Sequence, residues 1–172
     1  MIETFNCFTQ KQIEEINKKI RKNALQKEIG EDGSGTKISE TSIVICDPEL
    51  MEELSPWIYQ CQRLNRGVFG YDIYWDFHLE AMKYNVYGPG GGNGWHIDLN
   101  PKGPEDMKLS CLINLSEEPY EGGELHIVGA GPIKFTPGEG LVFNSLLAHK
   151  ITPVTKGERI TLLYWAYGPS WR

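Results

Sequence analysis

From Tyr71 onward the chain is a series of short β-prone segments separated by turn signals, and this pattern constrains the fold most. Gly-Gly, Gly-Pro, Pro-Gly and Lys-Gly pairs punctuate the series at near-regular spacing. We expect strands at 71–77, 81–87, around His96, and at 109–115, 123–128, 133–136, 140–144, 149–154 and 159–166. Short strands spaced in this way are typical of a β-sandwich or barrel of the jelly-roll kind.

The first 70 residues predict mainly helices. Ile13, Ile16 and Ile20 recur at helical spacing, with Thr9 as a cap, so an amphipathic support helix is expected to about Ala24. Asp47-Pro48 predicts the start of a second helix, because Asp caps helices and Pro suits the first turn.

This second helix is expected to run to about Leu64 or Phe69, with an interruption at Pro56. Between the helices, Gly30–Gly35 predicts a polar surface loop, with a flap over a site as the alternative, and Ser42–Cys46 predicts a short strand.

The length of 172 residues suits a single domain, with a helical support region at 1–70 and a jelly-roll core at 71–172. A net charge of −6 disfavours nucleic acid as a partner. Neither a membrane span of about 20 apolar residues nor a secretory leader is expected. The scattered cysteines, Cys7, Cys46, Cys61 and Cys111, predict reduced thiols in a cytoplasm, that of a bacterium or a phage-infected host.

The segment Gly94–Asp98 holds the side chains with the clearest chemical meaning. Residues two apart in a strand point to the same face, so His96 and Asp98 would aim an imidazole and a carboxylate into one space. One more histidine completes the two-His-one-carboxylate set used by non-haem Fe(II), and His149 is the candidate. Trp95 points the other way and is expected to pack. His78 and His126, which lie in strand patterns, are left out as ligand candidates.

Arg159 opens a strand that is apolar on both faces, which is an unfavourable place for an unpaired guanidinium. It shares one face of the strand with Thr161, Leu163 and Trp165. Trp165 is therefore expected to line the pocket that holds the metal. A carboxylate ligand would give Arg159 a charge-assisted pair worth roughly 1.5–3 kcal/mol. The alternative is an Arg159 at the exposed start of its strand.

Several of these segments together resemble the Fe(II)- and 2-oxoglutarate-dependent dioxygenases, in their prolyl 4-hydroxylase-like branch of bacterial and phage type. The resemblance covers about residues 71–171 and rests on Tyr87–Gly91, Gly94–Asp98, Leu109-Ser110, Tyr120–Leu125 and His149…Pro153–Arg159.

The resemblance implies a double-stranded β-helix, cupin-like, with helices packed against it. It implies iron held by His96, Asp98 and His149, and Arg159 paired with the distal carboxylate of 2-oxoglutarate. It also implies that the Tyr87 hydroxyl helps to hold this cosubstrate and that Asn114 and Thr161 line the same pocket. The implied cofactors are Fe(II), 2-oxoglutarate and O2, with ascorbate as reductant.

The implied activity is hydroxylation of a peptide or protein side chain, with proline as the expected target and succinate as the product of 2-oxoglutarate. Three alternatives stay open: the same chemistry on a free amino acid or another small molecule, nucleic-acid demethylation, and a non-catalytic jelly-roll module with a structural Zn(II). The last alternative gives Arg159 no reason to face the cavity.

Overall fold

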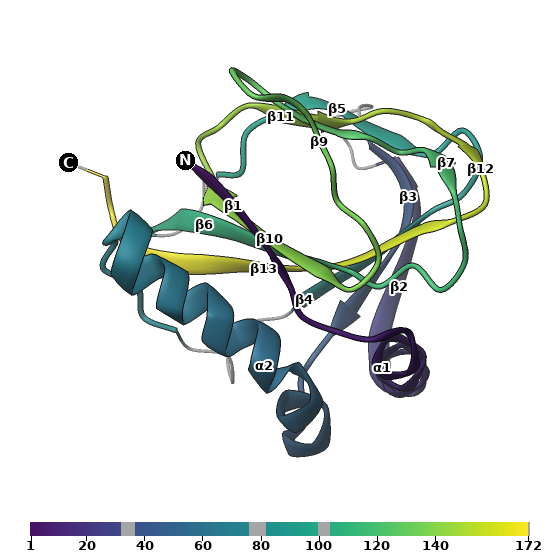
Figure 1. Ribbon diagram of the computed structural model, residues 1–172, viewed down its shortest axis with the longest axis horizontal. Coiled ribbons are helices and arrows are strands. Elements are labelled where there is room, and N and C mark those ends of the chain that lie inside the picture. The colour runs from purple at the N-terminus through teal and green to yellow at the C-terminus, as the bar shows by residue number, and fades with distance from the viewer. Residues whose placement is uncertain (32–36, 76–81, 100–103, 172) are drawn as a thin grey trace.

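The computed structural model describes residues 1–31, 37–75, 82–99 and 104–171. Within them, an eleven-stranded sheet curls into two layers, and two helices lie against the outer side of one layer (Figure 1). The predicted fold class, mainly β with N-terminal helices and of jelly-roll type, is confirmed. No helix in the described part of the chain combines the length and the apolar character that crossing a bilayer requires.

Most neighbouring strands of the sheet are far apart in the sequence, and the pairs are antiparallel. From one edge the order is β1 (Ile2–Asn6), β10 (Glu139–Asn144), β6 (Glu105–Asn114), β13 (Arg159–Pro169), β4 (Met82–Tyr87), β3 (Lys37–Val44), β5 (Gly92–His96), β11 (His149–Ile151), β8 (Leu125–Ile127) and β9 (Gly131–Ile133). In addition, β2 (Ala24–Glu31) pairs with β3, and β7 (Glu121–Gly122) pairs with β12 (Val154–Lys156) in a small second sheet.

Strand β3 joins the two layers. Its later residues pair with β4, where Thr41 lies opposite Asn85, whereas its first residue, Lys37, lies opposite Asn93 of β5. The start of β3 therefore lies in the layer that carries His96.

Alternation along β13 divides the core into two parts. Ile160, Leu162 and Tyr164 belong to the cluster between the sheet and the helices, while Leu163 packs against the smaller cluster between the layers. The layer that contains β6 and β13 is thus buried on both faces, which explains its nearly continuous apolar sequence.

Helix α1 (Gln10–Asn23) begins after Thr9, as predicted, and buries its isoleucine stripe completely. Burial of each such side chain contributes roughly 1.5–3 kcal/mol. Asn17 lies in the same buried face: its amide donates to the Leu115 carbonyl at 2.8 Å and accepts from the Tyr84 hydroxyl at 2.9 Å. These bonds fix α1 against the barrel.

Helix α2 (Pro48–Leu64) has the predicted Asp47 cap, whose carboxylate accepts from the Leu50 amide at 2.8 Å. The predicted interruption at Pro56 is wrong, because the helix continues through it. Proline removes the N–H that would bond to the Glu52 carbonyl, and the Ser55 hydroxyl donates to that carbonyl instead, at 2.8 Å. A π-helical turn at Asn65–Phe69 follows.

Three expectations in the strand pattern were wrong or incomplete. Residues 71–75 form no regular strand, and 76–77 lie outside the described residues. The strand expected at Ser42–Cys46 is β3, which ends at Val44. The region 1–70 also contains β1 and β2, which the sequence did not indicate, and Gly30 ends up in β2 rather than in a loop, while residues 32–36 of that loop are not described.

Candidate metal and cosubstrate site

His96, Asp98 and His149 converge, although they come from separate parts of the chain. Each offers one ligand atom, and these atoms lie within 4.8 Å of one another. The convergence follows from the sheet, because His149, the first residue of β11, lies directly opposite His96, the last residue of β5. Asp98 lies two residues past the end of β5, yet its carboxylate still faces the histidines, 3.8 Å from His96 and 3.7 Å from His149.

Both imidazoles are held so that one nitrogen faces the shared space. Nδ1 of His96 is 2.7 Å from the Gly94 carbonyl, and Nδ1 of His149 is 2.9 Å from the Leu147 carbonyl. A carbonyl oxygen can only accept, so each Nδ1 donates to that carbonyl and Nε2 is the nitrogen that faces the shared space. Nε2 of His96 also lies 3.2 Å from the amide nitrogen of Asn93. This is the arrangement that metal-binding histidines use.

The Asp98 carboxylate is buried and fixed by two serines. Ser110 donates to Oδ2 of Asp98 at 2.6 Å, and the Ser110 and Ser145 hydroxyls lie 3.0 Å apart. The backbone amide of Asp98 donates to the Ser145 carbonyl at 3.0 Å. The carboxylate therefore has a defined orientation before any metal binds.

Burial lowers the pKa of His149 below its ordinary value, although the nearby Asp98 carboxylate acts in the opposite direction. A lowered pKa keeps the imidazole neutral at physiological pH, which is the form that binds metals. Two neutral imidazoles and a carboxylate are the ligand set that suits Fe(II) with open coordination positions. The residues present thus fit the metal that the resemblance implies.

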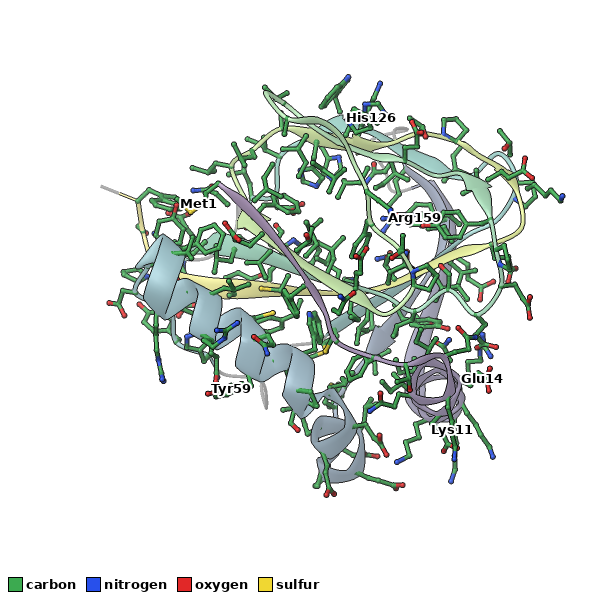
Figure 2. The ribbon with its side chains drawn as sticks, in the orientation of Figure 1. Met1, Lys11, Glu14, Tyr59, His126 and Arg159 are labelled. Carbon is green, nitrogen blue, oxygen red and sulfur yellow. The ribbon has the colours of Figure 1, made fainter. Side chains whose placement is uncertain are left out.

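Arg159 lies deeper in the same cavity, between the two layers of the sheet, as Figure 2 shows. Its side chain is 1% exposed, and its guanidinium carbon lies 5.4 Å from the centre of the Tyr87 ring and 5.9 Å from that of Phe135. Burial lowers the pKa of Arg159, but a guanidinium stays protonated in proteins. The alternative of an exposed Arg159 is excluded.

The cavity has a volume of about 180 Å³ and extends from the metal-site residues to Arg159. Tyr87 and Thr161 line it beside Arg159, and Leu163 and Trp165 continue the same row of β13 toward the histidines. Nη2 of Arg159 is buried and has no hydrogen-bond partner within the described residues. A buried, unpaired donor of this kind fits a carboxylate that enters the cavity, as the distal group of 2-oxoglutarate would.

Asn114 is placed differently from the expectation. It does not line the cavity, because its amide donates to the Phe135 carbonyl at 2.9 Å and to the Tyr120 hydroxyl at 3.1 Å. Its Oδ1 accepts from Ser116 at 2.7 Å, so the side chain is fully used in fixing the loop after β6.

Two residues that the sequence analysis did not assign to the site, Trp95 and His126, lie outside the cavity. Trp95 points away from the cavity, but it is 52% exposed rather than packed, with Lys150 5.0 Å from its ring centre. His126 belongs to β8 and lies on the outer side of the layer that also contains β11, at the top of the view in Figure 2. Its Nε2 is 3.1 Å from the Glu124 carboxylate. His78 lies outside the described residues.

Sequence reasoning quoted Ser110 within the Leu109-Ser110 segment but gave it no role at the site. It missed Ser145 and three further polar residues that line the cavity, Lys37, Asn85 and Asn93. Ser110 left a signal, since it is polar within the otherwise apolar stretch Leu109–Leu112. Lys37 left none, because a lysine next to a glycine-rich loop is ordinarily a surface residue.

The model of the 2OG-Fe(II) oxygenase superfamily matches residues 82–167, which contain the metal-site residues and Arg159. A PKHD-type hydroxylase of Pseudomonas putida KT2440 is 40% identical over 91 residues, and one of Acidovorax ebreus is 34% identical over 93 residues. These matches cover 47% and 48% of this chain. The chain spans only 40% and 41% of the lengths of these relatives.

Solved structures share the fold over nearly the whole chain. A viral collagen prolyl hydroxylase from Paramecium bursaria Chlorella virus-1, determined as its 2OG complex, has a TM-score of 0.72 at 18% identity, covering 97% of this chain and 96% of that one. A Trichoplax adhaerens prolyl hydroxylase, in complex with a peptide fragment of the hypoxia inducible factor, has a TM-score of 0.72 at 17% identity, with coverages of 96% and 83%. With half of its length matched by the family model, this chain belongs to the 2OG-Fe(II) oxygenase superfamily.

Proposed function

We propose that this protein is an Fe(II)- and 2-oxoglutarate-dependent dioxygenase that hydroxylates a peptide or protein side chain, with proline as the first target to test. The observation that carries the proposal is the shared cavity. The His96, Asp98 and His149 ligand atoms meet in it, and the buried Arg159 lines it with an Nη2 donor that has no partner among the residues that the structure describes. The PKHD-type relatives and the prolyl hydroxylase structures support it.

In this proposal each residue of the cavity has a stated task. His96 and His149 would bind Fe(II) through Nε2, and Ser110 would hold the Asp98 carboxylate in its binding orientation. Arg159 would bind the distal carboxylate of 2-oxoglutarate, with Tyr87 and Thr161 lining that end of the cavity. When bound, Fe(II) with 2-oxoglutarate and O2 supplies oxidation of an unactivated C–H bond, with succinate and CO2 as products.

The protein contributes orientation and protection from water. Apolar side chains, among them Leu112, Leu125 and Ile151, line the cavity between its polar groups. They strengthen electrostatic interactions inside it and limit side reactions. A non-catalytic Zn(II) module would not need, at the far end of the cavity, a buried guanidinium whose Nη2 has no hydrogen-bond partner among the described residues.

The test is turnover of 2-oxoglutarate. The purified protein would be supplied with Fe(II), ascorbate and 2-oxoglutarate, with and without proline-containing peptides, and succinate would be measured. We expect succinate from the wild type and a loss of at least about a hundredfold for His149→Ala, because a metal ligand is removed. An iron-loaded wild type that forms no succinate, with or without peptide, would contradict the proposal.

A further inference from the structure

The buried side-chain atoms that lack a hydrogen-bond partner gather in one place. Among the described residues there are four such nitrogen or oxygen atoms, and three of them belong to residues that line the metal and cosubstrate cavity, namely Asn93, Arg159 and Trp165. Folded proteins pair nearly all of their buried polar atoms, so a group of unpaired ones in a single cavity indicates a ligand that supplies the missing partners. In the proposed function, the distal carboxylate of 2-oxoglutarate would pair with Nη2 of Arg159. Oδ1 of Asn93 and Nε1 of Trp165 then still need an explanation.

A β-bulge in β5 brings Asn93 to the face of the strand that carries His96. His149 lies opposite His96 and Ile151 lies opposite Asn93, so an interval of two residues in β11 pairs with an interval of three in β5. The extra residue shifts the alternation of side chains, and Asn93 therefore shares a face with His96. Nδ2 of Asn93 lies 3.2 Å from Nε2 of His96, which agrees with this shared face. The Asn93 amide thus lies beside the nitrogen that would bind the metal.

Trp165 lies in the opposite wall of the cavity, also at the metal end. It pairs with Ser110 of β6, whose hydroxyl donates to the Asp98 carboxylate. Trp165 belongs to the layer of β13, whereas Asn93 belongs to the layer of β5. Layers that pack face to face lie about 10 Å apart. The indole donor and the Asn93 acceptor therefore belong to facing walls, with room for a small polar group between them.

The two atoms require partners of opposite kind. Nε1 of Trp165 can only donate a hydrogen bond, and Oδ1 of Asn93 can only accept one. A trans amide offers both an acceptor and a donor, and its C=O and N–H point in opposite directions, which suits a group between two facing walls. A carboxylate or a ketone offers no donor. Since both atoms belong to uncharged groups, an uncharged amide suits them better than the charged ends of a free amino acid, which would lose their hydration against neutral partners.

We propose that Trp165 and Asn93 bind one amide group of the primary substrate, with Nε1 of Trp165 donating to its carbonyl oxygen and Oδ1 of Asn93 accepting from its N–H. The inference rests on the proposed function and narrows the substrate class to molecules with a secondary amide beside the residue that is hydroxylated, as in a peptide. For a proline target this amide is the one that follows the proline, because the nitrogen of proline itself carries no hydrogen.

The experiment measures binding without turnover. Protein loaded with Zn(II) and N-oxalylglycine, an analogue of 2-oxoglutarate that is not decarboxylated, would be studied by ligand-observed NMR. The probes are the acetyl-glycyl-Xaa N-methylamides, with Xaa each of the twenty proteinogenic residues, and the twenty free amino acids. Each amide that binds is then altered at one amide group at a time, by N-methylation or by conversion to a thioamide. We expect N-methylation of one group to weaken binding at least about tenfold, and its thioamide about three- to tenfold, because each change removes a buried hydrogen bond.

Variants assign the two effects to the two side chains. Asn93→Leu removes the acceptor at similar volume, so it should reduce the N-methylation effect to less than about twofold and retain the thioamide effect. Trp165→Phe keeps an aromatic ring but removes the donor, so it should do the reverse. Asn6→Leu and Trp95→Phe are the matched controls and should retain both effects, because Asn6 and Trp95 are exposed and do not line the cavity.

Four results would overturn the inference: a wild type that binds N-oxalylglycine but none of the amides, free amino acids that bind more tightly than every amide, a wild type that tolerates both changes at every amide group, or effects that survive unchanged in Asn93→Leu and Trp165→Phe. The first three need no variant. Failure of the proposed function looks different, since the wild type would then bind neither Zn(II) nor N-oxalylglycine. Thermal unfolding and N-oxalylglycine binding show whether each variant keeps its fold and its metal site.

Discussion

The Ser110 hydroxyl donates to Oδ2 of Asp98 at 2.6 Å, from the middle of a strand in the opposite layer of the barrel. This contact joins β6 to the segment after β5, which has already left the regular strand when it reaches Asp98. It explains how a residue outside the strand keeps its carboxylate aimed at His96 and His149. The orientation of the metal site therefore depends on a residue that would not itself bind the metal.

Replacement of Ser110 tests this dependence. Ser110→Ala removes the hydrogen bond but no metal ligand, so we expect Mn(II) affinity to fall by about 10- to 100-fold. Ser55→Ala serves as the control, because Ser55 bonds to a helix carbonyl on the exposed surface. Titration with Mn(II), followed by electron paramagnetic resonance, measures both. Equal affinities for Ser110→Ala and wild type would show that Asp98 is oriented without Ser110.

Arg159→Met should separate stability from cosubstrate binding. Without a ligand, the variant replaces a buried guanidinium whose Nη2 has no partner in the described parts of the chain, so its free energy of unfolding should equal or exceed that of the wild type. Saturating 2-oxoglutarate should stabilise the wild type by about 2.7 kcal/mol at a hundred times its Kd, and the variant not at all. Thermal unfolding with Mn(II) present measures both effects.

The control for this substitution is Arg63→Met, which removes an exposed cation from α2 and should retain the response to 2-oxoglutarate. An Arg159→Met variant that 2-oxoglutarate stabilises as much as the wild type would place the distal carboxylate elsewhere.

Gly123 allows a second test of the Arg159 position. Its φ is +62°, and a Cβ there would lie 2.9 Å from Cδ of Arg159 and 2.9 Å from Cγ2 of Val154. Gly123→Ala should therefore cost about 1–2 kcal/mol of backbone strain and also weaken 2-oxoglutarate binding by displacing the arginine. Gly129→Ala has similar strain at φ +83° with open space around it, so it should lose stability only. Equal cosubstrate affinities in the two variants would contradict the predicted displacement.

Cys7, Cys46 and Cys61 should react slowly in the folded protein. Burial raises the pKa of Cys7 to about 11 and that of Cys46 to about 11, and it raises the pKa of Cys61 well above its usual range. The thiolate is the reactive form, so alkylation of Cys7 and Cys46 at pH 8 should be roughly a hundredfold slower than that of an ordinary thiol with pKa near 8.5. The rate should rise with pH up to about 11.

Iodoacetamide labelling followed by peptide mass spectrometry measures these rates, and protein unfolded in guanidinium chloride is the reference. Native Cys7 or Cys46 reacting at the unfolded rate at pH 8 would mean that the fold does not raise the pKa of that thiol.

Asn17 connects the support helix to the barrel, and its loss should affect stability alone. Asn17→Ala leaves the Tyr84 hydroxyl and the Leu115 carbonyl without this partner, at an expected cost of about 2–4 kcal/mol, because buried polar groups lose their hydrogen bonds. Urea unfolding measures the loss, and Mn(II) affinity of the folded variant should stay unchanged. A cost below about 0.5 kcal/mol, the usual range for surface changes, would argue against this connection.

The positions of His96, Asp98 and Arg159 were predictable because each left a local sign in the sequence, whereas the role of His149 was inferred through the family resemblance. His96 and Asp98 stand two apart beside a glycine run, and Arg159 opens a strand that is otherwise apolar on both faces. Such signs can be read because successive side chains of a strand point to opposite faces of the sheet, so a polar residue stands out in a strand that is buried on both faces. The same alternation indicated that Trp165 would line the cavity, and the family resemblance indicated it for Thr161; both residues do line it.

The errors came from contacts that depend on distant parts of the chain. The strand β1 pairs with β10, more than a hundred residues away, and its own sequence is short and only partly apolar. Pro56 fits inside α2 because Ser55 replaces the missing donor and Leu54 and Trp57 continue the buried stripe. Lys37 enters the cavity only because β3 turns the corner between the layers.

The most direct test of the central claim is a crystal structure grown with Mn(II) and 2-oxoglutarate without O2, using anomalous scattering to locate the metal. The account predicts one Mn(II) peak bonded at about 2.0–2.2 Å to Nε2 of His96, Nε2 of His149 and the Asp98 carboxylate, with the distal carboxylate of 2-oxoglutarate on Arg159. A Mn(II) peak elsewhere, or a 2-oxoglutarate that does not reach Arg159, would contradict it.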